Sequence, residues 1–148
     1  TDMELQYEAI RALGNLRAVA AAPDIRKFLS GENKPTAYER YLPCAAIEAL
    51  GRMKDKASVK DIARWIRSAD KEPGTERYFS HYAIRAIESI TDLNLGSLTT
   101  SNDDRGKTEE AWSKWWDENK TKTEYGGEEP KPVETPKDGE EAPKEPPK

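Results

Sequence analysis

The feature that most constrains the fold is a six-residue motif that occurs three times at a fixed spacing. Residues 9–14 read Ala-Ile-Arg-Ala-Leu-Gly, residues 46–51 read Ala-Ile-Glu-Ala-Leu-Gly, and residues 83–88 read Ala-Ile-Arg-Ala-Ile-Glu. Both steps are 37 residues long. A fixed period between about 20 and 50 residues is typical of stacked repeats, in which each unit buries its apolar face against its neighbours. Such stacks usually provide binding surfaces rather than catalytic pockets.

Each motif lies within an apolar pattern of helical spacing. The apolar positions of the three copies are Leu5, Ile10, Leu13 and Leu16, then Leu42, Ile47, Leu50 and Met53, then Phe79, Ile84, Ile87 and Ile90. Alanines fill the gaps and allow helices to pack closely. The pattern therefore predicts a helix at the start of every unit.

A second helix is expected in each unit. Its apolar positions are Ile25, Phe28 and Leu29 in the first unit and Ile62, Trp65 and Ile66 in the second. In the third unit the same spacing returns only at Trp112, Trp115 and Trp116, 50 residues after the second set, which indicates an inserted loop between residues 93 and 107. The predicted hairpins pair residues 3–17 with 22–30, 37–54 with 58–69, and 75–91 with 108–119. Pro43 predicts that the helix of the second unit bends or starts late.

The chain is therefore expected to be all-α: an α-solenoid of three antiparallel helical hairpins over residues 1–120, with units of about 1–34, 35–72 and 73–120. Residues 121–148 contain six prolines, eight acidic residues and five lysines. This composition cannot bury enough apolar surface to offset the entropy of ordering, so it predicts a disordered tail, with Gly126 and Gly127 as linker.

The pattern resembles HEAT repeats, including the shorter HEAT-like type of many bacterial proteins. The resemblance is carried by the three motif copies and by the turn aspartates Asp55 and Asp92, which are again 37 residues apart. It covers residues 1–119. Two departures are Ala18 at the aspartate position of the first unit and the missing arginine early in the second helices. The resemblance implies the fold, but not one function, because HEAT stacks serve many roles.

Charge and composition exclude some classes of protein. The net charge is −4, and residues 121–148 contribute −3 of it, so the folded part is nearly neutral. This argues against a nucleic-acid binder, which usually carries a basic excess. No apolar run is long enough for a membrane span, so no membrane partner is expected. Cys44, the only cysteine, is expected to be a small buried hydrophobe, and the compartment is not indicated.

The sequence contains no recognisable catalytic constellation, and no cofactor or metal is expected. His81 is the only histidine, and Cys44 occupies the equivalent position one unit earlier, too far away to share a tetrahedral metal. Deoxyhypusine hydroxylase, a HEAT-like enzyme, uses repeated His-Glu pairs for iron, whereas His81 is followed by Tyr82. P-loop, dinucleotide-binding and nucleophile-elbow motifs are also absent.

The tryptophans allow two interpretations. Trp112, Trp115 and Trp116 are expected to form an aromatic lid that closes the core of the last unit. The alternative is a ligand contact, which would use these side chains together with Trp65.

Three basic residues form the candidate partner-binding site. Lys27 and Arg64 each lie two residues after the isoleucine of a second helix, and Lys114 matches them in the third unit. Since second helices line the concave surface of HEAT stacks, these residues are expected to form a basic ladder that binds an acidic peptide, a phosphate chain or another anionic partner. The alternative is an ordinary solvated face.

The sequence thus favours a non-catalytic scaffold or adaptor that binds another macromolecule, most plausibly a protein, through its second-helix face. One alternative is a HEAT-like lyase or cofactor-chaperone subunit, similar to phycobilin lyase components, with an aromatic cleft at Trp65 and Trp115. Another is a HEAT-like nucleic-acid binder. The outer apolar side of the first helix predicts that further upstream repeats or a partner subunit cover it.

Overall fold

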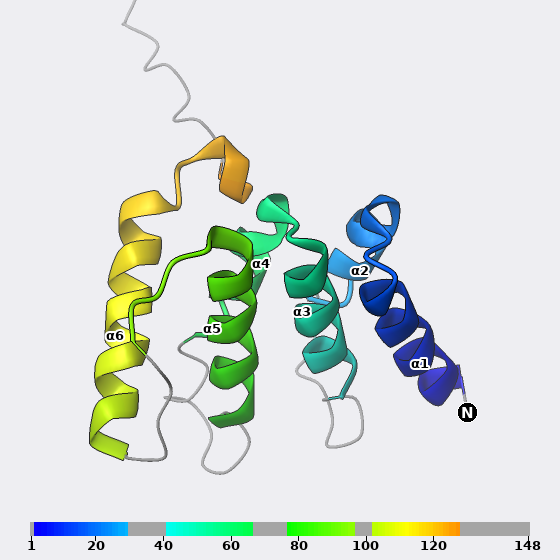
Figure 1. Cartoon of the computed structure of the whole chain (residues 1–148), viewed down its shortest axis with the longest axis horizontal. Helices are drawn as coiled ribbons and strands as arrows, with labels where there is room; N and C mark the ends of the chain where they lie inside the picture. Colours follow the sequence, from blue (N-terminus) through cyan, green and yellow to red (C-terminus); the bar gives the residue numbers. More distant parts are fainter. Residues whose placement is uncertain (1, 30–40, 67–76, 97–101, 128–148) are drawn as a thin grey trace, which may run out of the picture.

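The computed structural model describes residues 2–29, 41–66, 77–96 and 102–127, and every regular element within these ranges is helical (Figure 1). The longer helices are α1 (Asp2–Asn15), α3 (Tyr41–Met53), α5 (Arg77–Thr91) and α6 (Asn102–Asn119). The shorter elements are η1 (Val19–Ala21), α2 (Ala22–Arg26), η2 (Lys56–Ser58), α4 (Val59–Ala63) and η4 (Thr123–Tyr125). The predicted all-α repeat fold is confirmed.

The first helices of the three units, α1, α3 and α5, lie side by side in a row (Figure 1). They approach closely because a glycine of one helix faces an alanine of the next. A Cβ atom added to Gly14 would lie 2.7 Å from the Cα of Ala49, and one added to Gly51 would lie 2.9 Å from the Cα of Ala86. Real Cβ atoms do not approach other atoms this closely, so glycine permits a spacing that alanine would not.

Buried aliphatic side chains fill the space between the first and second helices. Ile10, Ile47 and Ile84, the isoleucines of the three motif copies, are at most 3 % exposed. Ile25 of α2 and Ile62 of α4 join the same core from the other layer. Each such side chain contributes about 1.5–3 kcal/mol to stability when it is fully buried.

The first two units turn from one helix to the next in the same way. Arg17 and Lys54 have φ angles of 51° and 54°, in the left-handed region. In the first unit the Ala18 N–H donates to the Leu13 carbonyl at 3.0 Å and the Arg17 N–H donates to the Gly14 carbonyl at 3.1 Å. These bonds define a Schellman motif, and the same pair recurs at the end of α3. The second helix therefore leaves each turn in an equivalent direction.

The second helices of units one and two are shorter than predicted. The expected ranges were 22–30 and 58–69, whereas α2 and α4 have five residues each. The chain continues beyond them with i→i−3 hydrogen bonds, as in Leu29 N–H to the Arg26 carbonyl at 2.9 Å. These tighter bonds are typical of frayed 3₁₀ ends, which apolar spacing alone does not distinguish from an α-helix.

Pro43 is the third residue of α3 as the structure describes that helix, from Tyr41. The predicted late start of this helix concerns residues 37–40, which lie outside the described residues. Proline is tolerated in the first turn of a helix because the N–H groups there have no partner within the helix.

The second helix of the third unit begins earlier than predicted. α6 starts at Asn102, within the range 93–107 that was assigned to a loop. Gly106 and the neighbouring polar residues are loop signals, but such local preferences are weak beside tertiary packing. Here the packing comes from Trp112, which is fully buried in the common core.

The folded part also extends past the predicted boundary at residue 120. The Tyr125 ring lies 5.4 Å from that of Trp115, and the Glu124 carboxylate pairs with the Lys56 ammonium at 3.2 Å. Gly126 is not a linker: its φ is 76°, and an added Cβ would lie 2.5 Å from the Ala57 carbonyl oxygen. Residues 128–148, the rest of the predicted tail, lie outside the described residues.

The close spacing of first helices ends at α5. Glu88 stands where Gly14 and Gly51 stand in the earlier units. α6 packs against α5 less extensively than α5 packs against α3. A glutamate side chain at this position does not leave the room for a closely approaching helix that Gly14 and Gly51 leave.

We predict that Gly14→Ala lowers the free energy of unfolding by about 1–3 kcal/mol, because the new methyl group overlaps the backbone of Ala49. Gly106→Ala is the matched control: it also lies in a helix, but a Cβ there meets nothing within 4 Å. That change is expected to raise stability by about 0.5–1 kcal/mol. Urea denaturation measures both, and equal effects at the two glycines would contradict the packing role of Gly14.

We predict that the chain ended after residue 120 unfolds at lower urea concentration than the chain ended after Gly127, with a loss of about 1–3 kcal/mol. The reason is that the shorter chain lacks the Tyr125 ring and the Glu124 ion pair. The chain ended after Gly127 should match the full chain. Identical midpoints for both truncated chains would show that residues 121–127 add nothing to the fold.

Candidate functional site

The three candidate basic residues are all exposed. Lys27 and Arg64 directly follow α2 and α4, and Lys114 lies on α6. The Lys27 ammonium contacts the Asp24 carboxylate at 2.6 Å, and this hydrogen bond lowers the pKa of Asp24. Arg64 and Lys114 have no ion pair or hydrogen bond with any other described side chain. The ladder of three stays a prediction, but two of its members are available to a partner.

The four tryptophans fall into separate ring contacts rather than one cleft. Trp65 lies on Phe79 with centroids 4.6 Å apart. The Trp115 ring meets the Trp112 ring edge-on, with centroids 5.6 Å apart, and it also packs against the Tyr125 ring. Trp116 is half-buried against the core. The lid interpretation of the α6 tryptophans stays a prediction, and Trp65 and Trp115 pack against different rings.

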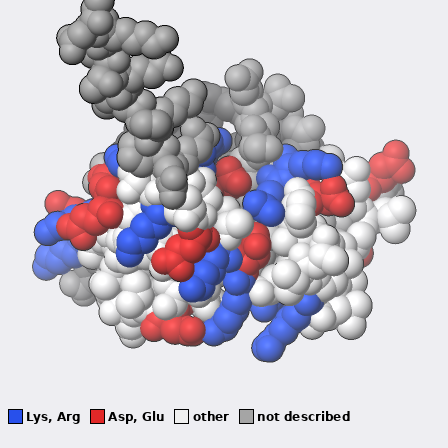
Figure 2. Space-filling model, turned by 90° about the horizontal axis from the view of Figure 1, so that it is seen from above, with Lys and Arg blue, Asp and Glu red and all other residues white. Residues whose placement is uncertain are grey.

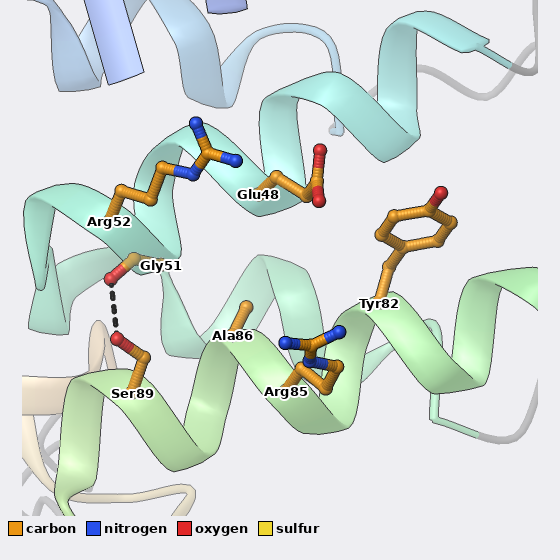
Figure 3. A pocket seen from close by; sticks show the side chains of 7 residues that line it. All are labelled: Glu48, Gly51, Arg52, Tyr82, Arg85, Ala86 and Ser89. Carbon is orange, nitrogen blue, oxygen red and sulfur yellow. Dashed lines mark hydrogen bonds between the residues drawn. The ribbon is translucent and has the colours of Figure 1, made fainter. Parts of the chain in front are cut away.

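A polar groove that the sequence did not predict lies between α3 and α5 (Figure 3). It has a volume of about 190 Å³, and its lining residues are Glu48, Gly51, Arg52, Tyr82, Arg85, Ala86 and Ser89. The Ser89 hydroxyl donates to the Gly51 carbonyl at 3.0 Å and thereby closes one end (Figure 3). The Arg52 guanidinium donates a hydrogen bond to Asn15 of α1. The groove is therefore held by contacts that join all three first helices.

Charges of both signs face this groove. Figure 3 shows Glu48 and Arg52 on α3 and Arg85 on α5, and all three line the groove. Neither the Glu48 side chain nor the Arg85 side chain has an ion pair or hydrogen bond with another described residue. Burial, aided by Cys44 and Glu48, raises the pKa of Tyr82. The groove can bind a polar group by hydrogen bonds, but it presents no nucleophile paired with a base.

A second cavity, of about 290 Å³, opens beside α1 at its N-terminal half. It is mostly apolar and is lined by Met3, Glu4, Tyr7, Glu8 and Tyr41. The rings of Tyr7 and Tyr41 meet edge-on, 6.5 Å apart. Neither this cavity nor the groove between α3 and α5 is lined by a tryptophan.

Comparison with protein families identifies the repeat. Residues 5–31, which contain most of α1 and all of α2, match the family model described as PBS lyase HEAT-like repeat. The first unit is therefore similar to a HEAT-like repeat, and the 37-residue period extends this similarity to the other two units. Comparison with curated proteins and with solved structures gave no match. HEAT-like repeats generally form non-catalytic helical scaffolds.

The HEAT-like units are also joined by ion pairs that the sequence interpretation missed. The Nε atom of Arg26 in the first unit lies 3.5 Å from Oδ2 of Asp55 in the second, and both atoms are shielded from solvent. Arg26 was not recognised because the arginine was sought at a position shared by all units, and its counterpart in the second unit is Ala63. Between the second and third units, Oδ1 of Asp92 pairs instead with the Lys54 ammonium at 2.6 Å. The turn aspartates therefore connect neighbouring units through different cations.

No described group of three His, Cys, Asp or Glu side chains could hold a metal ion. His81 lies beside Tyr82, with ring centroids 6.0 Å apart. None of the described helices is both long and apolar enough to span a bilayer. On the face seen in Figure 2, basic and acidic side chains are interspersed rather than separated by sign.

We predict that Cys44 reacts slowly as a thiol in the folded HEAT-like protein. Burial, with a smaller effect of Glu48, raises its pKa to about 12, and the thiolate is the reactive form. Between pH 8 and 10 the rate of alkylation by iodoacetamide should therefore keep rising about tenfold per pH unit. The urea-unfolded chain is the control, and its rate should level off above its ordinary thiol pKa of about 8.5. A native rate that levels off at the same pH would contradict the shift.

Proposed function

We propose that this HEAT-like protein is a non-catalytic scaffold segment that binds an acidic region of a protein partner through its second-helix face. The supporting observation is the availability of Arg64 and Lys114, which are exposed and have no ion pair or hydrogen bond with any other described side chain. By contrast, Lys54, Lys56 and Lys120 are each engaged in an ion pair. A cation that has no such partner breaks no existing ion pair when it binds a carboxylate, so less free energy is lost on binding.

The charges of Arg64 and Lys114 favour an acidic partner over a neutral one. An arginine binds a carboxylate with two parallel hydrogen bonds, and a lysine adds a second point of attraction. Lys27 is expected to contribute less, because Asp24 already neutralises it at 2.6 Å. Interspersed charges on the face seen in Figure 2 would limit non-specific binding of polyanions to that face.

The two alternative functions receive less support. A pigment-binding lyase or cofactor chaperone would require Trp65 and Trp115 to share a cleft, but each ring packs against a different aromatic neighbour. A nucleic-acid binder would be favoured by a continuous basic surface, and the face in Figure 2 carries both signs.

We predict that reversing the three second-helix cations together (Lys27→Glu, Arg64→Glu and Lys114→Glu) weakens binding of a fluorescent Glu-rich peptide at least about tenfold. Three favourable contacts become repulsive, and the effect should diminish as salt is added. Fluorescence anisotropy measures the affinity. The same variant should capture less partner from an extract of the source organism.

The matched control reverses three exposed arginines outside the second helices: Arg11→Glu, Arg17→Glu and Arg85→Glu. It changes the net charge equally, so it should leave peptide affinity nearly unchanged if the second-helix face is the binding site. Equal losses in both variants would show only a net-charge effect, and an unaffected second-helix variant would refute the proposed face. Tight, steeply salt-dependent binding of duplex DNA would favour the nucleic-acid alternative.

A further inference from the structure

The outer face of α1 carries an apolar stripe that no described residue covers. The stripe consists of Leu5, Ala9, Ala12 and Leu16, spaced so that all four lie on one side of the helix. Leu5 is 72 % exposed and Leu16 is 78 % exposed. Ala9 and Ala12 between them are also exposed. Two leucines on one exposed helix face are costly to leave in water.

The equivalent stripes of the next two helices are covered. In α3, the residues 37 positions after Ala9, Ala12 and Leu16 are Ala46, Ala49 and Met53, which are 0 %, 2 % and 6 % exposed. In α5, all four counterparts, which are Phe79, Ala83, Ala86 and Ile90, are at most 5 % exposed. The same positions are therefore buried where a preceding helix exists, except Leu42, the α3 counterpart of Leu5, which is partly buried.

The chain itself shows what covers the equivalent stripes of α3 and α5. α1 lies on the stripe of α3, with Gly14 against Ala49, and α3 lies on the stripe of α5, with Gly51 against Ala86. In each case the covering helix has an isoleucine four residues before its glycine, and both isoleucines are buried. The exposed stripe of α1 is thus one half of an interface that is completed twice in the same molecule.

We propose that the α1 stripe is the docking surface for one further helical hairpin of the same repeat type. Its first helix runs in the same direction as α1 and places a glycine, or an equally small residue, against Ala12. This surface is separate from the second-helix face, so the two proposals can fail independently.

The far end of the stack does not offer a suitable occupant. Glu88 replaces glycine on α5, and its side chain would meet Ala12 where no side chain fits in the two completed interfaces. Burial raises the pKa of Glu88, and Arg85 opposes this change, so a further apolar neighbour would increase the cost of its charge. A second copy therefore cannot extend the row end to end in this register, and the occupant is a unit that retains the glycine.

The test adds such a unit. A copy of residues 38–74 placed directly ahead of Thr1 keeps the 37-residue period and supplies the Gly51 glycine in register with Gly14. Leu16→Cys then reports on the stripe, because position 16 is exposed in the original chain and its counterpart Met53 is buried. We expect labelling of this cysteine by a thiol reagent to become at least about tenfold slower when the unit is added, since labelling would require the interface to open. Mass spectrometry separates this site from Cys44.

The matched control carries the same added unit with glutamate at the copied glycine, as in Glu88, and should restore fast labelling. Circular dichroism confirms that the added helices form in both chains. Unchanged labelling in the chain with the intact glycine, despite formed helices, would overturn the proposal. Labelling that slows with protein concentration in the chain without the added unit would also overturn it, because a second copy would then be the occupant.

Discussion

The architecture depends on the contact between a glycine of one first helix and an alanine of the next. Gly14 lies against Ala49 and Gly51 against Ala86, at distances that leave no room for a Cβ atom. This contact brings α1, α3 and α5 close enough for the motif isoleucines to be shielded from water. The ion pairs between units and the polar groove of Figure 3 follow from the same spacing, because they join side chains of adjacent units across it. A chain that repeats this contact forms a surface rather than an enclosed pocket.

The repeat fold could be predicted from the sequence because a fixed period and helical apolar spacing are properties of the chain itself. The predicted second helices were too long and α6 was predicted to start too late, because the form of a helix end depends on competing i→i−3 bonds and on packing partners such as Trp112. The predicted end of the folded part at residue 120 was too early for a related reason. Tyr125 stands among polar residues and carries no periodic signal, yet its ring packs on Trp115.

The candidate sites were less predictable than the fold. Sequence spacing located Arg64 and Lys114 on exposed positions, but it could not show that Lys27 is paired with Asp24. The groove between α3 and α5 was missed because its residues come from two units that meet only after stacking. One signal was present in the sequence. Glu48 and Arg85 are 37 residues apart, so stacking of the units places them on the same side of the row of first helices.

The most direct test of the account is nuclear Overhauser spectroscopy of the folded chain at the two glycine contacts. If α1, α3 and α5 are spaced as described, the Hα protons of Gly14 give strong cross-peaks to the methyl group of Ala49, and those of Gly51 give them to Ala86. Cross-peaks from either glycine to residues of its own unit alone would contradict the stacking on which the fold and both proposed surfaces depend.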